Sequence, residues 1–192
     1  MLSSNPISMT GELILILGCM WSGKTTKLLQ YYNKYKLKYS CLLINHSNDN
    51  RYKTNYITTH DSFSKKAISI KNIDDLDKNL YKNAKVILID ESQFFDKNII
   101  KFVKNAINLD NKIIIMAGLN SDFQKKKIGY INDLLVEADK IEYQNAICHF
   151  CKTPKDAIFS LRINKNNKKQ ILVGSNKNYV AVCRYHYKIN NI

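Results

Sequence analysis

The fold is decided by Glu12-Leu-Ile-Leu-Ile-Leu17 and the stretch that follows it directly, Gly18-Cys-Met-Trp-Ser-Gly-Lys-Thr25. The first is a short apolar run, typical of a strand that is buried on both faces. The second has the Gly-x4-Gly-Lys-Thr spacing of a phosphate-binding loop. Such a loop directs backbone N–H groups and the positive end of the next helix at one point. The sequence therefore predicts that this protein binds nucleotide phosphate.

The expected phosphate-binding residues lie in this loop and in the first turn of the helix after it. Lys24 should reach the outer phosphates, and the Thr25 hydroxyl should ligate magnesium. An ordinary glycine-rich turn is the alternative interpretation, but the apolar strand in front of the pattern argues against it. The full set is Gly18, Met20, Ser22, Gly23, Lys24, Thr25 and Thr26.

A second nucleotide signal is an apolar strand that ends in two carboxylates, Lys85-Val-Ile-Leu-Ile-Asp90-Glu91. An acidic residue at the carboxyl end of such a strand lies beside the phosphates and can hold magnesium, which is the function expected for Asp90. Successive strand residues point in opposite directions. Glu91 should therefore face a second substrate, where it could orient a hydroxyl or a water molecule.

Cysteine and histidine spacing predicts a metal site near the C-terminus. Cys148-His-Phe-Cys151 and Cys183-Arg-Tyr-His186 form a Cys-x2-Cys and a Cys-x2-His pair. Three thiolates and one imidazole close a tetrahedral zinc site without an open position, so the zinc should be structural. His149 is close enough to be mistaken for a ligand, but the spacing after Cys183 favours His186.

Alternating apolar runs and helical patterns predict an α/β fold, a P-loop (RecA-like) parallel sheet flanked by helices. We expect this domain over residues 1–145 and a small zinc-binding domain over residues 146–192. The polar stretch from Asn45 to Lys66 is expected to be a long loop. The expected strands are Glu12–Leu17, Ser40–Asn45, Ala67–Ile70, Val86–Ile89 and Lys112–Ala117, and the expected helices are Thr25–Lys36, Ile73–Tyr81, Lys97–Asn108 and Tyr130–Glu137.

Composition narrows the classes of partner. The formal net charge of +14 would ordinarily favour nucleic acid, but nearly all of it is lysine spread along the chain, and only three arginines occur. Arginine suits bidentate phosphate contacts best, so no dedicated nucleic-acid binding is expected. There is no run of about 18 apolar residues and no secretory signal pattern. With five cysteines, which fit a reducing compartment, we expect a cytoplasmic protein without a membrane partner.

Further motifs are Asp49-Asn-Arg51-Tyr52, Thr59-His-Asp61, Asp90-Glu-Ser-Gln-Phe-Phe95, Gly118-Leu-Asn-Ser-Asp-Phe123-Gln and Gly174-Ser-Asn-Lys-Asn-Tyr179. Together with the phosphate loop and the Cys/His pairs, they resemble the type II thymidine kinases. This cellular, bacterial and poxvirus-like family carries a zinc-stapled lasso. The resemblance extends over about residues 11–187, which is nearly the whole chain.

This resemblance implies an ATP-dependent thymidine kinase, which transfers the ATP γ-phosphoryl group to the 5′-hydroxyl of thymidine, and of deoxyuridine. Glu91 matches the family's catalytic carboxylate, which accepts the hydroxyl proton. Arg51 matches an arginine near the transferring phosphoryl group, and Lys24 completes the catalytic set. The resemblance also implies structural Zn²⁺, Mg²⁺ with ATP, feedback inhibition by dTTP and a homotetramer.

Thymine binding in this family implies a grip by the backbone of the lasso, here at Leu172 and Gly174. Tyr179 would lie across the nucleoside, Phe123 would stack near the base, and Met20 would contact its 5-methyl group together with Leu119. The implied nucleoside-binding residues are Met20, Asp49, Arg51, Glu91, Gln93, Leu119, Phe123, Leu172, Gly174 and Tyr179. The chain departs from the family pattern at Cys19, Ser92, Asn120, Asp122, Ile128 and Ser175.

Two other functions fit parts of the pattern. A nucleic-acid-stimulated ATPase would use the zinc knuckles and lysines to bind DNA or RNA. Residues 158–172 offer a few lysines for this but no clear stacking array. A non-catalytic module that binds zinc and nucleotide would not need Glu91.

Overall fold

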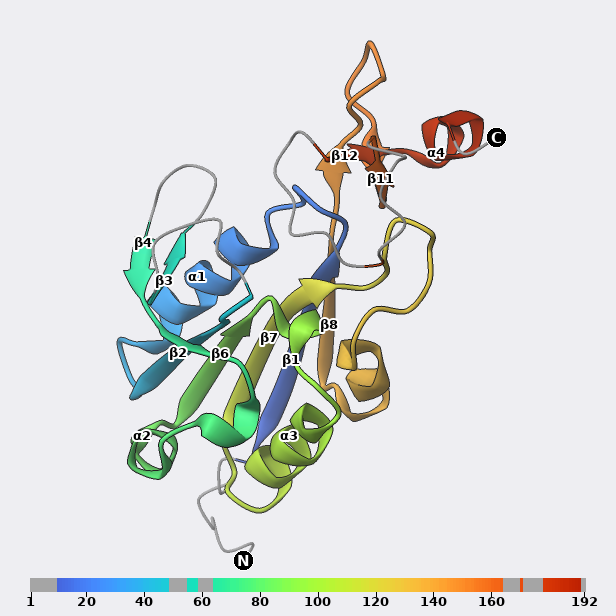
Figure 1. The fold of residues 1–192 in the computed structure, drawn as a ribbon. Helices are drawn as coiled ribbons and strands as arrows, with labels where there is room; N and C mark the ends of the chain where they lie inside the picture. The colour runs from blue at the N-terminus through green and yellow to red at the C-terminus, as the bar shows by residue number, and fades with distance from the viewer. Residues whose placement is uncertain (1–9, 49–54, 59–63, 164–169, 171–177, 191–192) are drawn as a thin grey trace, which may run out of the picture.

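The core of the structure is a six-stranded sheet in which every pairing is parallel (Figure 1). The computed structural model describes residues 10–48, 55–58, 64–163, 170 and 178–190. The spatial order of the strands is β5-β2-β6-β7-β1-β8. This confirms the predicted α/β fold. The strands are β1 (Glu12–Gly18), β2 (Cys41–His46), β5 (Ile68–Ile70), β6 (Val86–Asp90), β7 (Ile113–Leu119) and β8 (Lys140–Gln144).

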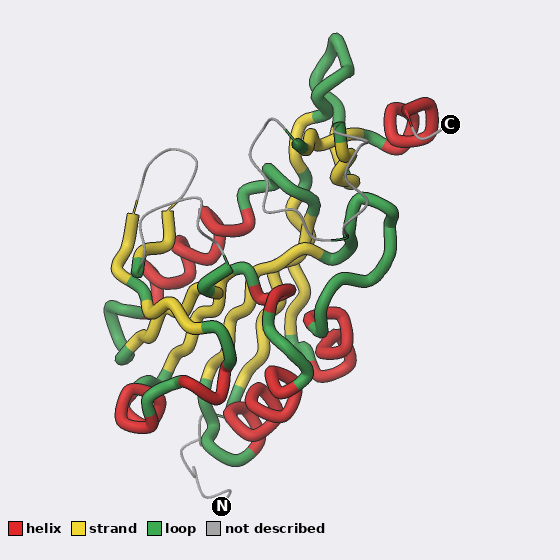
Figure 2. Tube along the Cα trace, viewed as in Figure 1, coloured by secondary structure: helices red, strands yellow, loops and turns green. Residues whose placement is uncertain are grey.

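Helical segments cover both faces of the sheet (Figure 2). One face is covered by α1 (Lys24–Tyr35), beside the antiparallel hairpin of β3 (Tyr56–Thr58) and β4 (Ser64–Lys66). The opposite face is covered mainly by α3 (Asn98–Asn108). The other segments in the first 145 residues are α2 (Lys78–Asn83) and the 3₁₀ turns η1 (Ile73–Asp75), η2 (Ser92–Phe94) and η3 (Ile131–Glu137).

Strand β1 shows why the deciding stretch is apolar throughout. Leu13, Leu15 and Leu17 belong to the core on the α3 face, whereas Ile14 and Ile16 belong to the core on the α1 face. Because alternate residues of a strand point to opposite faces, a strand with a hydrophobic layer on each side needs apolar side chains at every position. Burial of each such side chain contributes about 1.5–3 kcal/mol.

The expected long loop from Asn45 to Lys66 is wrong in two places. Strand β2 continues to His46, and the later part of the stretch forms the β3–β4 hairpin. Ile57 explains why the hairpin forms, because this side chain is buried against the α1 layer. A single apolar residue among polar ones gives a weak signal in the sequence.

Two expected helices also differ from the structure. The helix expected over Ile73–Tyr81 is split into η1 and α2, because the carboxylate of Asp77 accepts hydrogen bonds from the N–H groups of Asn79 and Leu80 and starts a new helix. The segment expected over Tyr130–Glu137 is a 3₁₀ turn rather than an α-helix.

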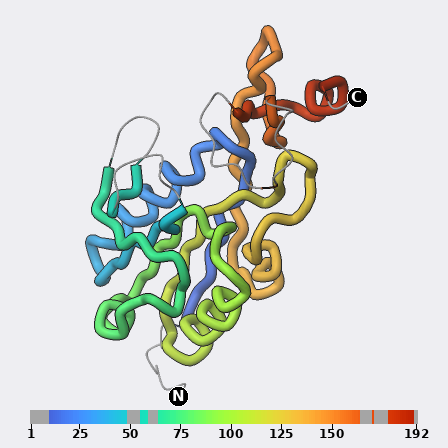
Figure 3. The backbone as a smooth tube through the Cα atoms, viewed as in Figure 1, coloured from blue at the N-terminus to red at the C-terminus, as the bar shows by residue number. Residues whose placement is uncertain are grey.

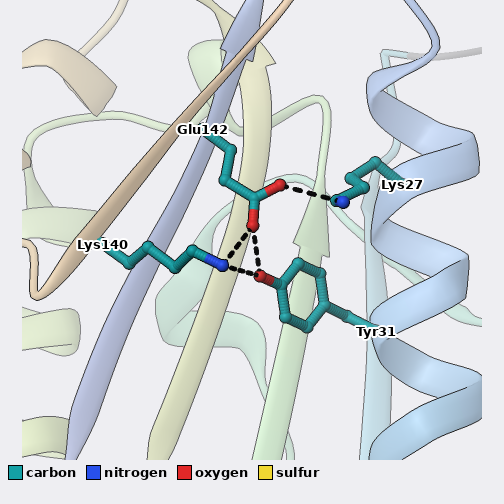
Figure 4. A network of polar contacts seen from close by, with 4 residues as sticks. All are labelled: Lys27, Tyr31, Lys140 and Glu142. Carbon is teal, nitrogen blue, oxygen red and sulfur yellow. Dashed lines mark hydrogen bonds and ion pairs between the residues drawn. The ribbon is translucent and has the colours of Figure 1, made fainter.

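Edge strand β8 is joined to helix α1 by four polar side chains (Figure 4). Glu142 accepts a hydrogen bond from the Tyr31 hydroxyl and pairs with Lys140 at 2.6 Å and with Lys27 at 3.1 Å. Lys140 also donates to the Tyr31 oxygen at 3.0 Å. Burial opposes ionisation of Glu142, but these donors prevail and lower its pKa to about 2. The network therefore holds α1, the helix that directly follows the phosphate-binding loop, against β8.

Glu142→Gln should therefore destabilise the protein by about 1 kcal/mol at neutral pH, the range of partly exposed ion networks. A carboxylate with a lowered pKa stabilises the fold above its unfolded pKa, near 4.5, and loses that effect as the pH falls towards 2. The difference between variant and wild type in urea unfolding should shrink from pH 7 to about pH 3. Glu137→Gln, which removes the ion pair with Lys104, is the control. A difference for Glu142→Gln that does not depend on pH would contradict the assignment.

The C-terminal segment lies beyond the carboxyl ends of the central strands (Figures 1 and 3). We call its described residues, 146–163, 170 and 178–190, the C-terminal unit. It contains two short antiparallel pairs, β9 with β10 and β11 with β12, and ends in a helix. No helix within the described ranges is both long and apolar enough to cross a membrane. The elements are β9 (Ala146–Ile147), β10 (Asp156–Ala157), β11 (Phe159–Arg162), β12 (Tyr179–Val182) and α4 (Arg184–Asn190).

Candidate active site and metal centre

The carboxyl ends of the parallel strands bring the predicted nucleotide residues to one edge of the sheet. Gly18 at the end of β1 is in register with Leu119 at the end of β7. One strand further, Ile89 of β6 is in register with Met116 of β7, so Asp90 ends at the same edge. Ligands of open parallel sheets bind beyond this edge.

Glycine is required at both ends of the phosphate-binding loop. A Cβ atom on Gly18 would lie 2.3 Å from the carbonyl oxygen of Gln144, so the loop could not pass β8 with any side chain there. Gly23 has φ 78°, and it precedes the first residue of α1. Trp21 also has a positive φ of 67°. The loop therefore turns sharply into the helix, which begins at Lys24, one residue before the expected start.

A polar side chain of the loop region meets the acidic strand end, because Thr25 contacts Asp90. The Thr25 hydroxyl donates to Asp90 Oδ2 at 2.9 Å, and Asp90 is buried. Lys24 Nζ donates to the carbonyl of Cys19 at 2.6 Å and lies 3.5 Å from the hydroxyl of Ser22, so its ammonium group is held over the loop. Of the other expected residues, Met20 is half-buried and Thr26 is exposed.

Glu91 is held in an unusual backbone conformation next to this pair. Its φ of 50° and ψ of 36° are left-handed, which costs a non-glycine residue about 1–2 kcal/mol. Gln93 Nε2 donates to Glu91 Oε2 at 2.6 Å, and Gln93 Oε1 accepts from the N–H of Leu119 at 3.0 Å. Gln93 is buried. The expected nucleoside-binding residue Gln93 thus contacts Glu91 and β7, where it fixes the carboxylate.

The four predicted metal ligands form one cluster. Their ligand atoms lie within 4.8 Å of one another. Nδ1 of His186 is 3.4 Å from each of the sulfurs of Cys148, Cys151 and Cys183, and the last two sulfurs are 3.9 Å apart. Tetrahedral zinc with Zn–S of about 2.3 Å and Zn–N of about 2.0 Å requires separations of about 3.8 Å for S···S and about 3.5 Å for S···N. The cluster is compatible with structural zinc.

Backbone groups favour the thiolate form of Cys148, whereas burial and the neighbouring sulfurs raise the pKa of the Cys151 thiol to about 11. Burial raises the pKa of the Cys148 thiol, but N–H groups of Cys183 and Phe150 oppose it, and the pKa falls to about 6. The N–H of Cys183 lies 3.2 Å from the Cys148 sulfur. Thiolate is the form that binds a metal ion. His149 is not part of the cluster, because its ring packs at an edge against Phe150 instead.

Three consecutive loop residues are bound to the C-terminal unit. The Cys19 thiol donates to the carbonyl of Ala157 at 3.3 Å, the Met20 N–H donates to the Ser160 hydroxyl at 3.0 Å, and the Trp21 indole donates to the carbonyl of Tyr179 at 3.3 Å. In Figure 3 the blue loop segment accordingly runs up to the orange and red segment. Cys19 belongs to the same buried cluster as Ala157. The phosphate-binding loop and the C-terminal unit therefore share a core.

Two residues expected at the base lie together at this junction. The rings of Phe123 and Tyr179 are 6.4 Å apart and tilted by 58°. Phe123 is half-buried in the loop after β7, and Tyr179 is buried at the start of β12. Leu119 is the last residue of β7. The remaining expected residues Asp49, Arg51, Leu172 and Gly174 lie outside the residues that the structure describes.

Comparison with known proteins identifies the family. A family model for thymidine kinase matches residues 11–187. The chain belongs to the type II thymidine kinase family. One relative is the thymidine kinase of Myxoma virus (strain Uriarra), with 36% identity over 92% of this chain and 96% of the relative. The thymidine kinase of Amsacta moorei entomopoxvirus is 38% identical over 90% of this chain and 96% of the relative. The thymidine kinase of Sheeppox virus (strain KS-1) is 39% identical over 92% of this chain and 97% of the relative.

Three departures from the thymidine kinase pattern are buried, and two of them make defined hydrogen bonds. The hydroxyl of Ser92 donates to the carbonyl of Ala117 at 2.8 Å, and Ser92 is fully buried. Asp122 Oδ1 accepts from the N–H groups of Gln124 and Lys126, each at 2.8 Å, and so shapes the loop that carries Phe123. Ile128 is a buried core residue.

Sequence reasoning missed several residues that shape the candidate site of this thymidine kinase family member. They act through contacts between distant segments, so spacing within a motif could not reveal them. One signal was available for Arg162, a charged residue within a short strand whose other positions are mostly buried. The missed residues are Trp21, Ser160, Arg162, Gln170 and Tyr187, which link the loops around Phe123 and Tyr179.

Proposed function

We propose that this chain is an ATP-dependent thymidine kinase, which forms dTMP and ADP from thymidine and ATP and also accepts deoxyuridine. Membership of the family supports the reaction. The observation that carries the assignment of the site is the 2.9 Å contact between the Thr25 hydroxyl and Asp90. It joins the phosphate-binding loop to the acidic strand end, with Glu91 as the next residue.

The phosphates of ATP would lie over the loop from Gly18 to Thr26. Its backbone N–H groups and the N-terminus of α1 stabilise negative charge there, and Lys24 would exchange its carbonyl partner for a phosphate oxygen. The oxygen pair of Thr25 and Asp90 fits Mg²⁺, which prefers oxygen ligands and bound water. When bound with ATP, Mg²⁺ neutralises charge on the transferring group. Arg51, by its match to the family motif, would stabilise the same charge.

Glu91 would accept the proton of the 5′-hydroxyl as the phosphoryl group is transferred. The hydrogen bond from Gln93 to Oε2 fixes the orientation of this carboxylate, so that it can be presented to the 5′-hydroxyl. Phosphoryl transfer passes through a loose transition state in which positioning and charge stabilisation dominate. A carboxylate held in place by both its backbone and Gln93 meets that requirement.

The thymine base would bind between the two units. We place its faces near Phe123 and Tyr179 and its 5-methyl group near Met20 and Leu119. Leu172 and Gly174 would offer backbone contacts, and Asp49 and Gln93 would complete the pocket. Zinc at the Cys148, Cys151, Cys183 and His186 cluster would pre-organise the lasso, so that less ordering accompanies binding.

The wider organisation is part of the same proposal. Residues 1–145 would form the ATP-binding domain, and residues 146–192 would form the lasso domain, which closes on the nucleoside. The family resemblance supports a cytoplasmic homotetramer that is inhibited by dTTP, with its base in the lasso pocket and its phosphates at the donor site. It does not support dedicated nucleic-acid binding.

The test is to incubate the purified protein with Mg-ATP and each of thymidine, deoxyuridine, deoxycytidine, deoxyadenosine and deoxyguanosine. We expect monophosphate from thymidine and deoxyuridine alone. Turnover of cytosine or purine nucleosides would support the kinase activity but contradict the assignment of the thymine pocket. No product from any of them, together with ATP hydrolysis that depends on DNA, would favour the ATPase alternative.

A further inference from the structure

Arg162 lies at the junction of the two units, where the structure places a buried charge against the aromatic pair. It is the last residue of β11, and only 5% of its surface is exposed. Its guanidinium carbon lies 3.7 Å from the centre of the Phe123 ring and 5.0 Å from that of the Tyr179 ring. A guanidinium over an aromatic face is attracted by the ring's electrons, more strongly where water is excluded.

The same guanidinium fixes the hydroxyl of Tyr179. Nε donates to the Tyr179 oxygen at 3.0 Å, and Nη2 donates to the same oxygen. Such charge-assisted bonds to a planar fork define the direction of the partner as well as its distance. Because Phe123 and Tyr179 come from different units, one side chain sets the position of both rings.

Arg162 also holds the loop after β7 through Gln170. Nη2 donates to the carbonyl of Gln170 at 3.1 Å, and Gln170 Nε2 donates to Asp122 Oδ2 at 2.8 Å. Asp122 precedes Phe123. From the other side, the Tyr187 hydroxyl donates to the carbonyl of Phe123 at 2.7 Å. The ring and the backbone of Phe123 are thus both held by the C-terminal unit.

We propose that Arg162 is a positioning residue for nucleoside specificity, which aligns Phe123 and Tyr179 to receive a pyrimidine base. It would act through these rings rather than by touching the reacting atoms. This inference rests on the proposed function, because it assigns the same pocket. It predicts that loss of the guanidinium weakens nucleoside binding and leaves the phosphate-binding loop intact.

Arg162→Met keeps most of the length of the side chain and removes its charge and donors. We expect it to raise the Kd and KM for thymidine at least tenfold, equivalent to about 1.4 kcal/mol. The KM for ATP and kcat should change less than about threefold. The guanidinium bonds to Tyr179 and Gln170, whereas the catalytic groups bond to other residues of the loop and of the β6 end. Thymidine affinity would be measured by calorimetry and by fluorescence of Trp21, the only tryptophan.

Arg184→Met is the matched control. Arg184 is exposed in the same unit and lies over the ring of Phe159 at 5.0 Å. It should leave thymidine affinity within about twofold of wild type, below the tenfold shift expected for Arg162. Arg162→Lys, which keeps the charge but not the planar fork, should restore part of the affinity.

Equal thymidine affinity of wild type and a folded Arg162→Met would overturn the positioning role, even if the protein is a thymidine kinase. Failure of the wild type to bind any nucleoside would instead overturn the proposed function. If Arg162→Met does not fold, Tyr179→Phe tests the same link, because it removes the oxygen that accepts both bonds and keeps the ring. An unchanged thymidine Kd in Tyr179→Phe would then contradict the proposal.

Discussion

Glu91→Gln should lower kcat by about 10²- to 10⁴-fold, the usual contribution of a positioned general base. The amide cannot accept the proton of the 5′-hydroxyl. Its oxygen can still accept the hydrogen bond that Gln93 donates to Glu91, so the local geometry should survive. The KM values for ATP and thymidine should remain within a few-fold, which would separate a loss of chemistry from a loss of binding.

Single-turnover kinetics with saturating ATP and thymidine would measure the effect, because product release cannot mask it. Glu137→Gln is the isosteric control. Glu137 forms an ion pair with Lys104 on the surface, and its replacement should leave turnover at the wild-type level. If Glu91→Gln kept more than about a tenth of the wild-type kcat, another group would have to accept the proton. The melting temperature of both variants should stay close to that of wild type.

Removal of zinc should have the largest effect on stability. Structural zinc sites contribute on the order of 10 kcal/mol of folding free energy, which is comparable to the whole stability of an ordinary domain. Cys151→Ser, or chelation of wild type, should therefore unfold the C-terminal unit and abolish thymidine binding. ATP binding should weaken as well, because Cys19, Met20 and Trp21 lose partners in that unit.

The matched control is Cys41→Ser, since Cys41 lies in β2 outside the metal cluster. Zinc content should be one ion per chain in wild type and Cys41→Ser, and near zero in Cys151→Ser. Adding zinc back to chelated wild type should restore thymidine binding. Unchanged nucleoside affinity in metal-free protein would show that the metal does not support the pocket.

Local spacing predicted the nucleotide and metal sites, because each is defined by residues a few positions apart. A glycine-rich turn before Lys24 indicates a phosphate-binding loop, and a carboxylate at the end of an apolar strand indicates a residue beside the phosphates, whatever the order of the strands in the sheet. Likewise, each Cys/His pair is recognised from its own spacing, and the fold only has to bring the two pairs together. The comparisons confirmed the family, and the structure confirmed the sheet and the ligand cluster.

Strand β8 was missed because it lies at the edge of the sheet. Its residues alternate between charged and apolar side chains, with Ile141 and Tyr143 39% and 60% exposed. Such alternation is in itself a strand signal, but it does not show that the strand pairs with β1 on the side opposite β7. Arg162 escaped notice for another reason. Its partners Phe123 and Tyr179 are separated from it by 39 and 17 residues, so only the folded chain brings them into contact.

The contacts of the phosphate-binding loop also determine the order in which a newly made chain can fold. Cys19, Met20 and Trp21 bind groups that lie 138, 140 and 158 residues later. At a synthesis rate of about 5–20 residues per second, the loop waits roughly 7–28 s for the first of these partners. Strand β1 also cannot pair until later, since both of its neighbours in the sheet, β7 and β8, lie beyond the first hundred residues.

We therefore expect that ribosome-bound chains stalled before Ala157 remain sensitive to protease around the loop, with or without ATP, and that full-length chains become protected. Protection of the shorter chains would show that the loop is completed without its late partners. If they stay sensitive, the segment translated first is among the last to reach its native conformation, and the nascent protein cannot engage its nucleotide until almost all of it has been synthesised.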